Sequence, residues 1–310
     1  MAKPFLKWAG GKTALLPELL KAAPRQIETY YEPFLGGGAL FFALQAEGRF
    51  NQAVLSDSNE ELINAYTQVR DNVDQLIRAL KVHQTKYRHS EDRAEYYYTI
   101  RSKKLTCDLG GAANLIFLNK TCFNGLYRVN SKGHFNVPHG KYQNPTICDE
   151  RNLRAVSEAL QGVTLKVADF ATAPATAGSR DFAYFDPPYV PVSETAYFTA
   201  YTAKDFGAED QARLASTAST LASQGADVAL SNSGHPDVAS MYSSDLFELN
   251  EVRVRRSINS NARGRGPVRE YLIQSASPDP SFLRRQESRS TQQHSANGQQ
   301  SSLDLRERDS

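Results

Sequence analysis

Short apolar runs that alternate with helical patterns constrain the fold of this chain more than any other feature. Runs rich in β-branched and aromatic residues predict strands at 29–31, 53–56, 163–167, 182–185, 227–230, 247–254 and 271–274. Helical patterns lie between several of them, as at 39–47 and 208–223. Strands that alternate with helices indicate a largely parallel sheet covered on both faces. We expect the final two strands to pair antiparallel.

Residues 70–145 interrupt this α/β pattern. Helical periodicity leads into a charged, aromatic stretch and then into a loop rich in Asn, Gly and Lys. We therefore predict a mostly helical inserted domain at 70–145, with 1–69 and 146–274 forming one discontinuous domain around it. From residue 275 onward Ser, Gln, Arg and Asn dominate and hydrophobic periodicity ends, which predicts a disordered tail over 275–310.

The tetrapeptide Asp186-Pro187-Pro188-Tyr189 follows the predicted strand at 182–185. Proline fixes its own φ and keeps the preceding residue out of the helical region, so the corner is rigid. Open α/β sheets bind ligands at the carboxyl ends of their strands. Asp186 and the Pro187 carbonyl could accept hydrogen bonds from a planar amine while Tyr189 covers the ring that carries it. From these four residues alone, a plain turn after a buried strand remains the alternative.

Glycines 36–38 follow the first predicted strand, and Asp57 ends the second. Glycine lets a backbone approach a ligand closely, and an acid in this position can bond a ribose diol. The dinucleotide fingerprint is incomplete, because Phe41 stands where its third glycine belongs. A phosphate-binding loop is also disfavoured, because Leu6 replaces the glycine needed before the pair Gly11-Lys12. These departures favour a nucleoside that carries no phosphate.

The segment 119–143 carries four Lys and Arg side chains and no acid, in a chain whose formal net charge is only +2. The turn at 131–133 between aromatic flanks predicts a β-hairpin. A two-stranded ribbon fits the major groove of DNA, where arginine can read guanine. A solvated surface hairpin is the alternative, but aromatic and amide groups interleaved with charge favour DNA. A second acid-free run, 253–269, holds six arginines and suits phosphate contacts.

Composition narrows the class of protein. Hydrophobic residues make up 40% of the chain and charged residues 23%, as in ordinary globular proteins. Three cysteines without a CxxC pair argue against a disulfide framework or a zinc site. No stretch approaches the roughly 20 apolar residues of a membrane span, and the start lacks the apolar core of a signal peptide. We expect a cytoplasmic monomer with no metal and no membrane partner.

Five motifs in order resemble the Dam-type, or D12, class of DNA adenine-N6 methyltransferases, and most closely its GATC-specific branch. They lie at 5–12, 32–38, 56–59, 120–142 and 186–189. The likeness implies a Rossmann-like seven-stranded methyltransferase sheet in the discontinuous domain, with 70–145 as the target-recognition domain. It also implies S-adenosyl-L-methionine as cofactor, S-adenosyl-L-homocysteine as its product, and double-stranded DNA in a bacterial or phage nucleoid.

The resemblance further implies a role for particular residues. The catalytic group is Asp186, Pro187 and Tyr189. The cofactor group is Trp8, Lys12, Phe34, Gly36, Gly38, Asp57, Asp169, Phe170 and Asp186. The DNA-binding group is Lys7, Phe123, Asn124, Leu126, Arg128, Asn130, Asn136, Pro138, Lys141 and Tyr142.

Within the DNA-binding group, the likeness implies that Arg128 and Lys7 each read a guanine and that Leu126 and Pro138 contact a thymine methyl. Residues 123–124 would fill the gap left by an adenine flipped out of the duplex. Two other functions stay open on the residues alone. Cytosine-N4 methylation uses a similar corner, although Ser commonly replaces the Asp there, and a DNA-binding regulator could keep the hairpin without transferring methyl groups. A role in restriction–modification and a role in host marking for replication or mismatch repair are equally compatible.

Overall fold

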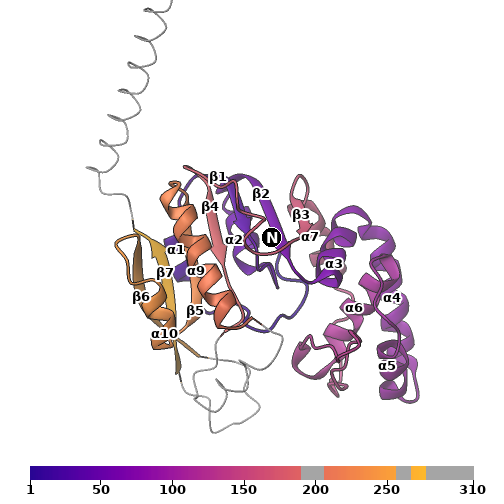
Figure 1. Ribbon diagram of the computed structural model, residues 1–310. Helices are drawn as coiled ribbons and strands as arrows, with labels where there is room; N and C mark the ends of the chain where they lie inside the picture. The colour runs from indigo at the N-terminus through magenta and orange to yellow at the C-terminus, as the bar shows by residue number, and fades with distance from the viewer. Residues whose placement is uncertain (190–205, 256–266, 277–310) are drawn as a thin grey trace, which may run out of the picture. The chain divides into compact units, whose positions relative to one another are not determined.

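The computed structural model describes residues 1–189, 206–255 and 267–276, and within them the chain forms a mixed α/β fold around a seven-stranded sheet (Figure 1). The strand order is β3-β2-β1-β4-β5-β7-β6. The strands are β1 (Ile27–Glu32), β2 (Phe50–Asp57), β3 (Thr164–Val167), β4 (Phe182–Phe185), β5 (Asp227–Ser233), β6 (Phe247–Arg255) and β7 (Pro267–Ser275). β1 to β5 pair in parallel, whereas β7 runs antiparallel to both β5 and β6. The predicted strands and the antiparallel final pair are confirmed.

Helices flank this sheet and fill the interval between β2 and β3. They are α1 (Leu16–Ala22), α2 (Ala39–Ala46), α3 (Glu60–Asp71), α4 (Val73–His89), α5 (Arg93–Arg101), α6 (Leu109–Thr121), the short 3₁₀ helix η1 (Phe123–Gly125), α7 (Glu150–Ala159), α9 (Ala208–Ser223) and α10 (Pro236–Met241). In Figure 1, α9 crosses in front of the sheet, and α4 to α6 lie together beyond its β3 edge. None of the described helices is long and apolar enough to span a bilayer.

Alternation of side chains along the strands supplies both faces of the sheet with a hydrophobic core. Tyr30, Tyr184 and Leu272 belong to the core that includes α1, α2, α3 and α7. Their neighbours Tyr31 and Phe185 belong to the other core, which includes α9 and α10. Successive side chains of a strand point to opposite faces, so each strand contributes to both cores. The polar residues at the carboxyl end of each strand are left at the end of the sheet, outside the two cores.

The β-hairpin predicted within 119–143 is wrong in one respect. The turn is present, since Gly133 N donates to the Asn130 carbonyl over 2.9 Å, and backbone hydrogen bonds of 2.9 Å join Asn130 N to the His134 carbonyl and Asn136 N to the Arg128 carbonyl. The two flanks meet in isolated bridges, Val129 to Phe135 and Cys122 to His139, and not in a continuous pair of strands. Side chains from the helical layer occupy backbone groups that a ladder would have used. The Val137 carbonyl, for example, accepts from the Tyr97 hydroxyl at 2.8 Å.

The residue that caps α3 is not the first polar residue after β2, and two predicted segments lie largely outside the described residues. Ser58 can cap the helix after β2 by its chemistry, but Asn59 caps α3, accepting from Leu62 N at 2.8 Å. Most of the arginine-rich run 253–269 and nearly all of the predicted tail 275–310 lie outside the described residues.

Candidate active site and DNA interface

The carboxyl end of β4 places Asp186 beside two other residues that the sequence singled out. The Lys12 ammonium lies 2.7 Å from Asp186 Oδ1 and donates to the Gly10 carbonyl at 2.7 Å. The same ammonium lies 4.5 Å from the centre of the Tyr189 ring. The predicted corner therefore gathers a carboxylate, a cationic N–H donor and an aromatic face around one point.

A second donor holds Asp186 from the side of β5. Ser231 donates its hydroxyl to Asp186 Oδ1 over 3.0 Å, and the Tyr184 hydroxyl lies 2.8 Å from the same Ser231 oxygen. Burial raises the pKa of Asp186, while the charge and hydrogen bond of Lys12 oppose that rise. Both of these donors contact Oδ1, and the Asp186 side chain remains 20% exposed, so the carboxylate can accept a further N–H donor.

Glu32, at the end of β1, is a second carboxyl group behind the corner. It is buried, and it accepts from the Tyr30 hydroxyl over 2.9 Å. Burial raises the pKa of Glu32 to about 8, with the charge of Asp186 acting in the same direction. Glu32 is therefore mostly protonated at neutral pH.

Two further contacts, which sequence reasoning missed, fix the far side of the corner. The Tyr189 hydroxyl donates to Glu270 Oε2 over 2.9 Å. Gln211 of α9 donates to the Pro188 carbonyl at 3.4 Å and accepts from Asn232 at 2.9 Å. Glu270, Gln211 and Asn232 are all buried, so the corner is braced by polar groups that lie out of solvent.

The predicted cofactor loop follows β1 and contacts Asp57 at the end of β2. Gly36 N donates to Asp57 Oδ2 at 3.2 Å, and Asn59 N donates to the other carboxylate oxygen at 3.0 Å. Gly36 has φ +46°, and a Cβ there would lie 2.8 Å from Trp8 Cδ1, so a close approach requires glycine. Gly38 also has a positive φ and is buried at the start of α2. Asp57 keeps free lone pairs that can accept from a diol.

The other predicted cofactor residues form an aromatic cluster. The Phe34 and Phe170 rings are stacked with centroids 5.3 Å apart. Arg213 holds Asp169 with two hydrogen bonds of 2.7 and 2.9 Å and covers Phe170 at 4.1 Å. The Arg213 hydrogen bond lowers the pKa of Asp169. No contact joins Asp169 directly to Asp57 or Asp186 in the described residues.

The segment before Lys12 lies between two loops. One is the predicted cofactor loop, 34–38, and the other is the loop 122–143, called the recognition loop because it is predicted to read DNA. Trp8 stacks on Tyr127 with ring centroids 5.2 Å apart. The buried Asn119 side chain accepts from Lys7 N at 2.9 Å and donates to the carbonyls of Lys7 and Gly125, at 2.7 and 3.1 Å. Sequence reasoning gave Asn119 no role, because its partners are brought to it by the fold.

The predicted base-reading residues lie on the described loop. Arg128 donates from Nε to Asn136 Oδ1 at 2.6 Å and from Nη2 to the Asn136 carbonyl at 3.0 Å. The Asn130 side chain closes the turn by accepting from the backbone N–H groups of Lys132 and His134. The Lys7 ammonium lies 5.0 Å from the centre of the Tyr142 ring.

The remaining residues of the loop include an exposed aromatic ring and two residues with a positive φ. Phe123 is 45% exposed, which is unusual for so large an apolar side chain. Its backbone N–H is bonded to the carbonyl of the exposed Pro138 at 2.8 Å. Asn124 and Lys141 have φ of 56° and 53°, a backbone region that non-glycine residues seldom adopt outside functional sites. Leu126 packs against the core and is partly buried.

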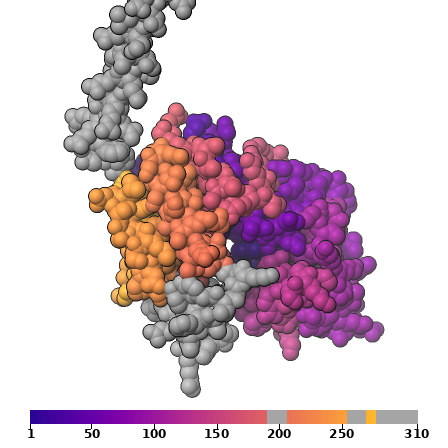
Figure 2. Space-filling view, in the orientation of Figure 1, coloured from indigo at the N-terminus to yellow at the C-terminus, as the bar shows by residue number. Residues whose placement is uncertain are grey.

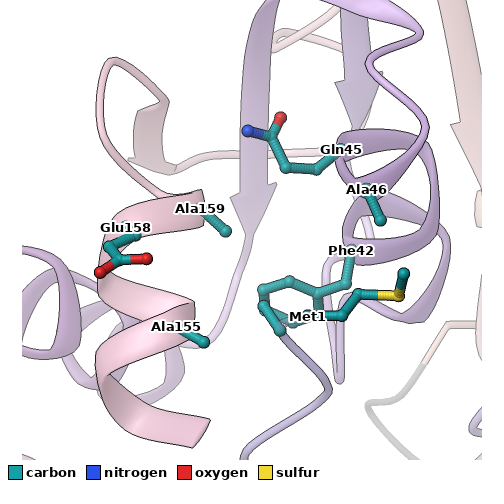
Figure 3. A pocket seen from close by; sticks show the side chains of 8 residues that line it. Met1, Phe42, Gln45, Ala46, Ala155, Glu158 and Ala159 are labelled. Atoms are coloured by element: carbon teal, nitrogen blue, oxygen red, sulfur yellow. The ribbon is translucent and has the colours of Figure 1, made fainter.

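The face of the molecule drawn in Figure 2 is hollowed. Figure 2 shows a hollow between the orange part of the surface, which includes α9 and β5, and the magenta and purple part, which includes α4 to α6. A different pocket lies between α2 and α7 (Figure 3) and is lined by Met1, Ala2, Phe42, Gln45, Ala46, Ala155, Glu158 and Ala159. No predicted site residue lines that second pocket. In the described part of the chain, no group of three or more His, Cys, Asp or Glu side chains is placed to hold a metal ion.

A nucleoside-type loop, an amine-accepting corner and a basic loop on one α/β sheet define the class of a nucleic-acid-modifying transferase. Residues 8–258 match the family described as D12 class N6 adenine-specific DNA methyltransferase, and the chain belongs to that family. It is therefore an adenine-specific DNA methyltransferase, an enzyme that acts on DNA.

Three relatives align with this chain over nearly their own whole length. The Type II methyltransferase M.MjaIII of Methanocaldococcus jannaschii is 43% identical over 285 residues, 87% of this chain and 98% of that protein. The Type II methyltransferase M1.LlaDCHI of Lactococcus lactis is 41% identical over 280 residues, 87% of this chain and 94% of that protein. The DNA adenine methylase of Escherichia coli is 35% identical over 272 residues, with the same two coverages of 87% and 94%.

Proposed function

We propose that this enzyme transfers a methyl group from S-adenosyl-L-methionine to N6 of an adenine that is extruded from duplex DNA, within the sequence GATC. The arrangement of Lys12, Asp186 and Tyr189 carries this proposal. An N–H donor lies 2.7 Å from the Asp186 carboxylate and 4.5 Å from the Tyr189 ring centre. An adenine amine stacked on that ring would present an N–H group to the same carboxylate.

The corner's chemistry suits a weak nucleophile. The lone pair of an adenine amine is conjugated into the ring, so the nitrogen attacks poorly unless it is pyramidalised. Asp186 and the Pro187 carbonyl would accept its two N–H bonds and direct the lone pair out of the ring plane. The bound cofactor supplies a methyl group on a sulfonium leaving group. After transfer the nitrogen becomes acidic, and Asp186 is the ionised carboxylate placed to take its proton.

The side chains of the cofactor group fit a nucleoside that carries a positive charge, because the acids among them can accept its hydrogen bonds. Asp57 accepts from two backbone N–H groups and retains lone pairs for the ribose hydroxyls. Asp169 and Phe170 would bracket the cofactor's adenine, and Phe34 would line the pocket beside them. Trp8, Lys12 and the glycines 36–38 would line the remainder of the pocket.

The recognition loop would read the DNA while the corner binds the target base. We propose that residues 70–145 form the recognition domain inserted into the catalytic domain of 1–69 and 146–274. Arg128 and Lys7 would bond guanines, and Leu126 and Pro138 would contact a thymine methyl. Extruding the adenine costs a few kcal/mol. Stacking on Tyr189 would return about 1–3 kcal/mol of that cost.

Labelled methyl transfer tests this proposal. The enzyme is incubated with radiolabelled S-adenosyl-L-methionine and duplexes that contain GATC or a single-base variant of it, and the modified base is identified. We expect N6-methyladenine in GATC alone. N4-methylcytosine would support the rival reaction, and no incorporation at all would support a non-catalytic DNA-binding protein.

Replacing the carboxylate tests the chemical step. Asp186→Ala and the isosteric Asp186→Asn should abolish transfer, because neither side chain can accept as a carboxylate does. DNA binding and the folded circular dichroism spectrum should survive. Activity of either variant within about tenfold of wild type, a barrier change of only about 1.4 kcal/mol, would contradict the role given to Asp186.

A further inference from the structure

A buried acid on β7, the last strand of the chain, approaches the corner. Glu270 is 5% exposed and lies directly opposite Ser233 in the antiparallel pair of β5 and β7. Two residues along β5, Ser231 donates to Asp186. Residues two apart on a strand share a face of the sheet. Glu270 and Ser231 therefore reach the corner from the same side.

The contact that Glu270 makes is with the ring expected to stack on the target base. Its Oε2 accepts from the Tyr189 hydroxyl over 2.9 Å. The hydroxyl oxygen lies at the far end of the long axis of the ring, so an anchor there fixes the direction in which the ring extends without covering its face. The face itself is what the Lys12 ammonium lies against in this structure.

We infer that Glu270 is a positioning residue for methyl transfer: it tethers the phenol of Tyr189 and so holds the ring as a preoriented platform for the extruded base. This inference rests on the proposed function. Tyrosine rings turn readily about two side-chain bonds, and a base that stacks on an untethered ring must fix it at a cost in entropy. A hydrogen bond that already fixes the ring in the free enzyme removes this entropy cost from the binding of the base.

A double-mutant cycle separates this role from a purely structural one. The variants are Glu270→Ala, Glu270→Gln, Tyr189→Phe and the pair Glu270→Ala with Tyr189→Phe. Glu248→Gln, a charge change at an exposed site on neighbouring β6, serves as the matched control. Single-turnover rate, KM for duplex DNA and thermal unfolding are measured for each variant.

We expect Glu270→Ala to lower the single-turnover rate roughly ten- to a hundredfold, the range that loss of a hydrogen bond to a charged group corresponds to. Glu270→Gln should recover most of the rate, because its amide oxygen can still accept from the phenol. Tyr189→Phe should show a loss similar to that of Glu270→Ala, and the double variant should lose little more than either single variant. Glu248→Gln should match wild type.

Two results would overturn the inference. One is a Glu270→Ala loss that persists in full when Tyr189 is already Phe, since Glu270 would then act through another group. The other is a loss that follows thermal stability alone and is absent from the rate of the folded enzyme. The resonance of a ¹³C-labelled Tyr189 ring, assigned with Tyr189→Phe, tests the tether without DNA: it should shift in Glu270→Ala and stay unchanged in Glu248→Gln. A wild-type enzyme that transfers no methyl group would instead refute the proposed function, and the ring resonance would still show whether the tether exists.

Discussion

Two carboxyl groups near the corner, the buried Glu32 and the partly exposed Asp186, have different neighbours. Asp186 has a lysine ammonium at 2.7 Å and a serine hydroxyl at 3.0 Å, which favour its charged form. Glu32 has one phenol donor, and its pKa is raised by burial to about 8. Enzymes separate the roles of paired acids by such differences in surroundings. The ionised acid is the one that faces the reacting base in the proposed mechanism.

Glu32 should leave a measurable mark on stability against pH. Its pKa is about 8 in the folded protein against an ordinary value of 4.5, so between these values the folded state keeps a proton that the unfolded state has lost. Linkage then requires the free energy of unfolding to fall as pH rises through that window. Urea denaturation at pH 5 and pH 8 should therefore show a smaller fall for Glu32→Gln than for wild type. The exposed Glu158→Gln serves as the control, and equal falls in all three proteins would rule out the assignment.

The Asp186–Tyr189 corner was predictable from sequence because its residues are adjacent in the chain. The side chains that hold the site in place were not predictable. Ser231, Glu270 and Asn119 act on partners that lie 45, 81 and 112 residues away. Such contacts depend on which strands become neighbours, and local patterns do not encode that order. One signal was present: an acid directly before the apolar run 271–273, where a buried strand leaves no room for an unpaired carboxylate.

At the scale of elements, the recognition loop is held by helices as well as by its own cross-strand backbone bonds. The Val137 carbonyl accepts from Tyr97 and Arg101 of α5, and the His139 ring lies 2.7 Å from the Tyr87 hydroxyl. Local patterns predicted the turn correctly because Asn130 and Gly133 are turn formers. They could not predict that side chains from α4 and α5 would also bond the loop, beside its few cross-strand backbone bonds. The loop is therefore positioned by the helical layer on which it lies.

Arg128 should determine specificity at one guanine. A good bidentate contact to guanine discriminates against other bases by about 1–3 kcal/mol. Arg128→Ala should therefore lower the rate ratio between GATC and the variant of that guanine by roughly five- to 150-fold. Asn136→Ala keeps the charge but releases the guanidinium, so the ratio should fall less and in the same direction. Lys132→Ala should weaken binding to all duplexes alike. A ratio that stays constant in Arg128→Ala would exclude this reading of the loop.

At the scale of the whole described molecule, one short segment connects the two halves of the site. Trp8 packs against Gly36 of the cofactor loop on one side and stacks on Tyr127 of the recognition loop on the other. The adjoining Lys7 is tied to Gly125 through the buried Asn119. A movement of either loop must displace this segment, because packed interiors do not deform continuously. Binding of cofactor and binding of DNA should consequently influence one another.

Removal of the Trp8–Tyr127 stack should weaken that influence. Cofactor affinity is measured with and without GATC duplex in wild type, Tyr127→Leu and Tyr127→Phe. The phenylalanine variant keeps the stack and loses the hydrogen bonds of the hydroxyl, to Glu61 at 3.1 Å and to Asn59. Coupling energies of this kind are typically about 1–3 kcal/mol, or five- to 150-fold in affinity. We expect the affinity ratio to approach one in Tyr127→Leu and to stay near the wild-type value in Tyr127→Phe. Because coupling is reciprocal, DNA affinity with and without cofactor must change by the same factor. Equal ratios in all three proteins would show that the two loops communicate by another route.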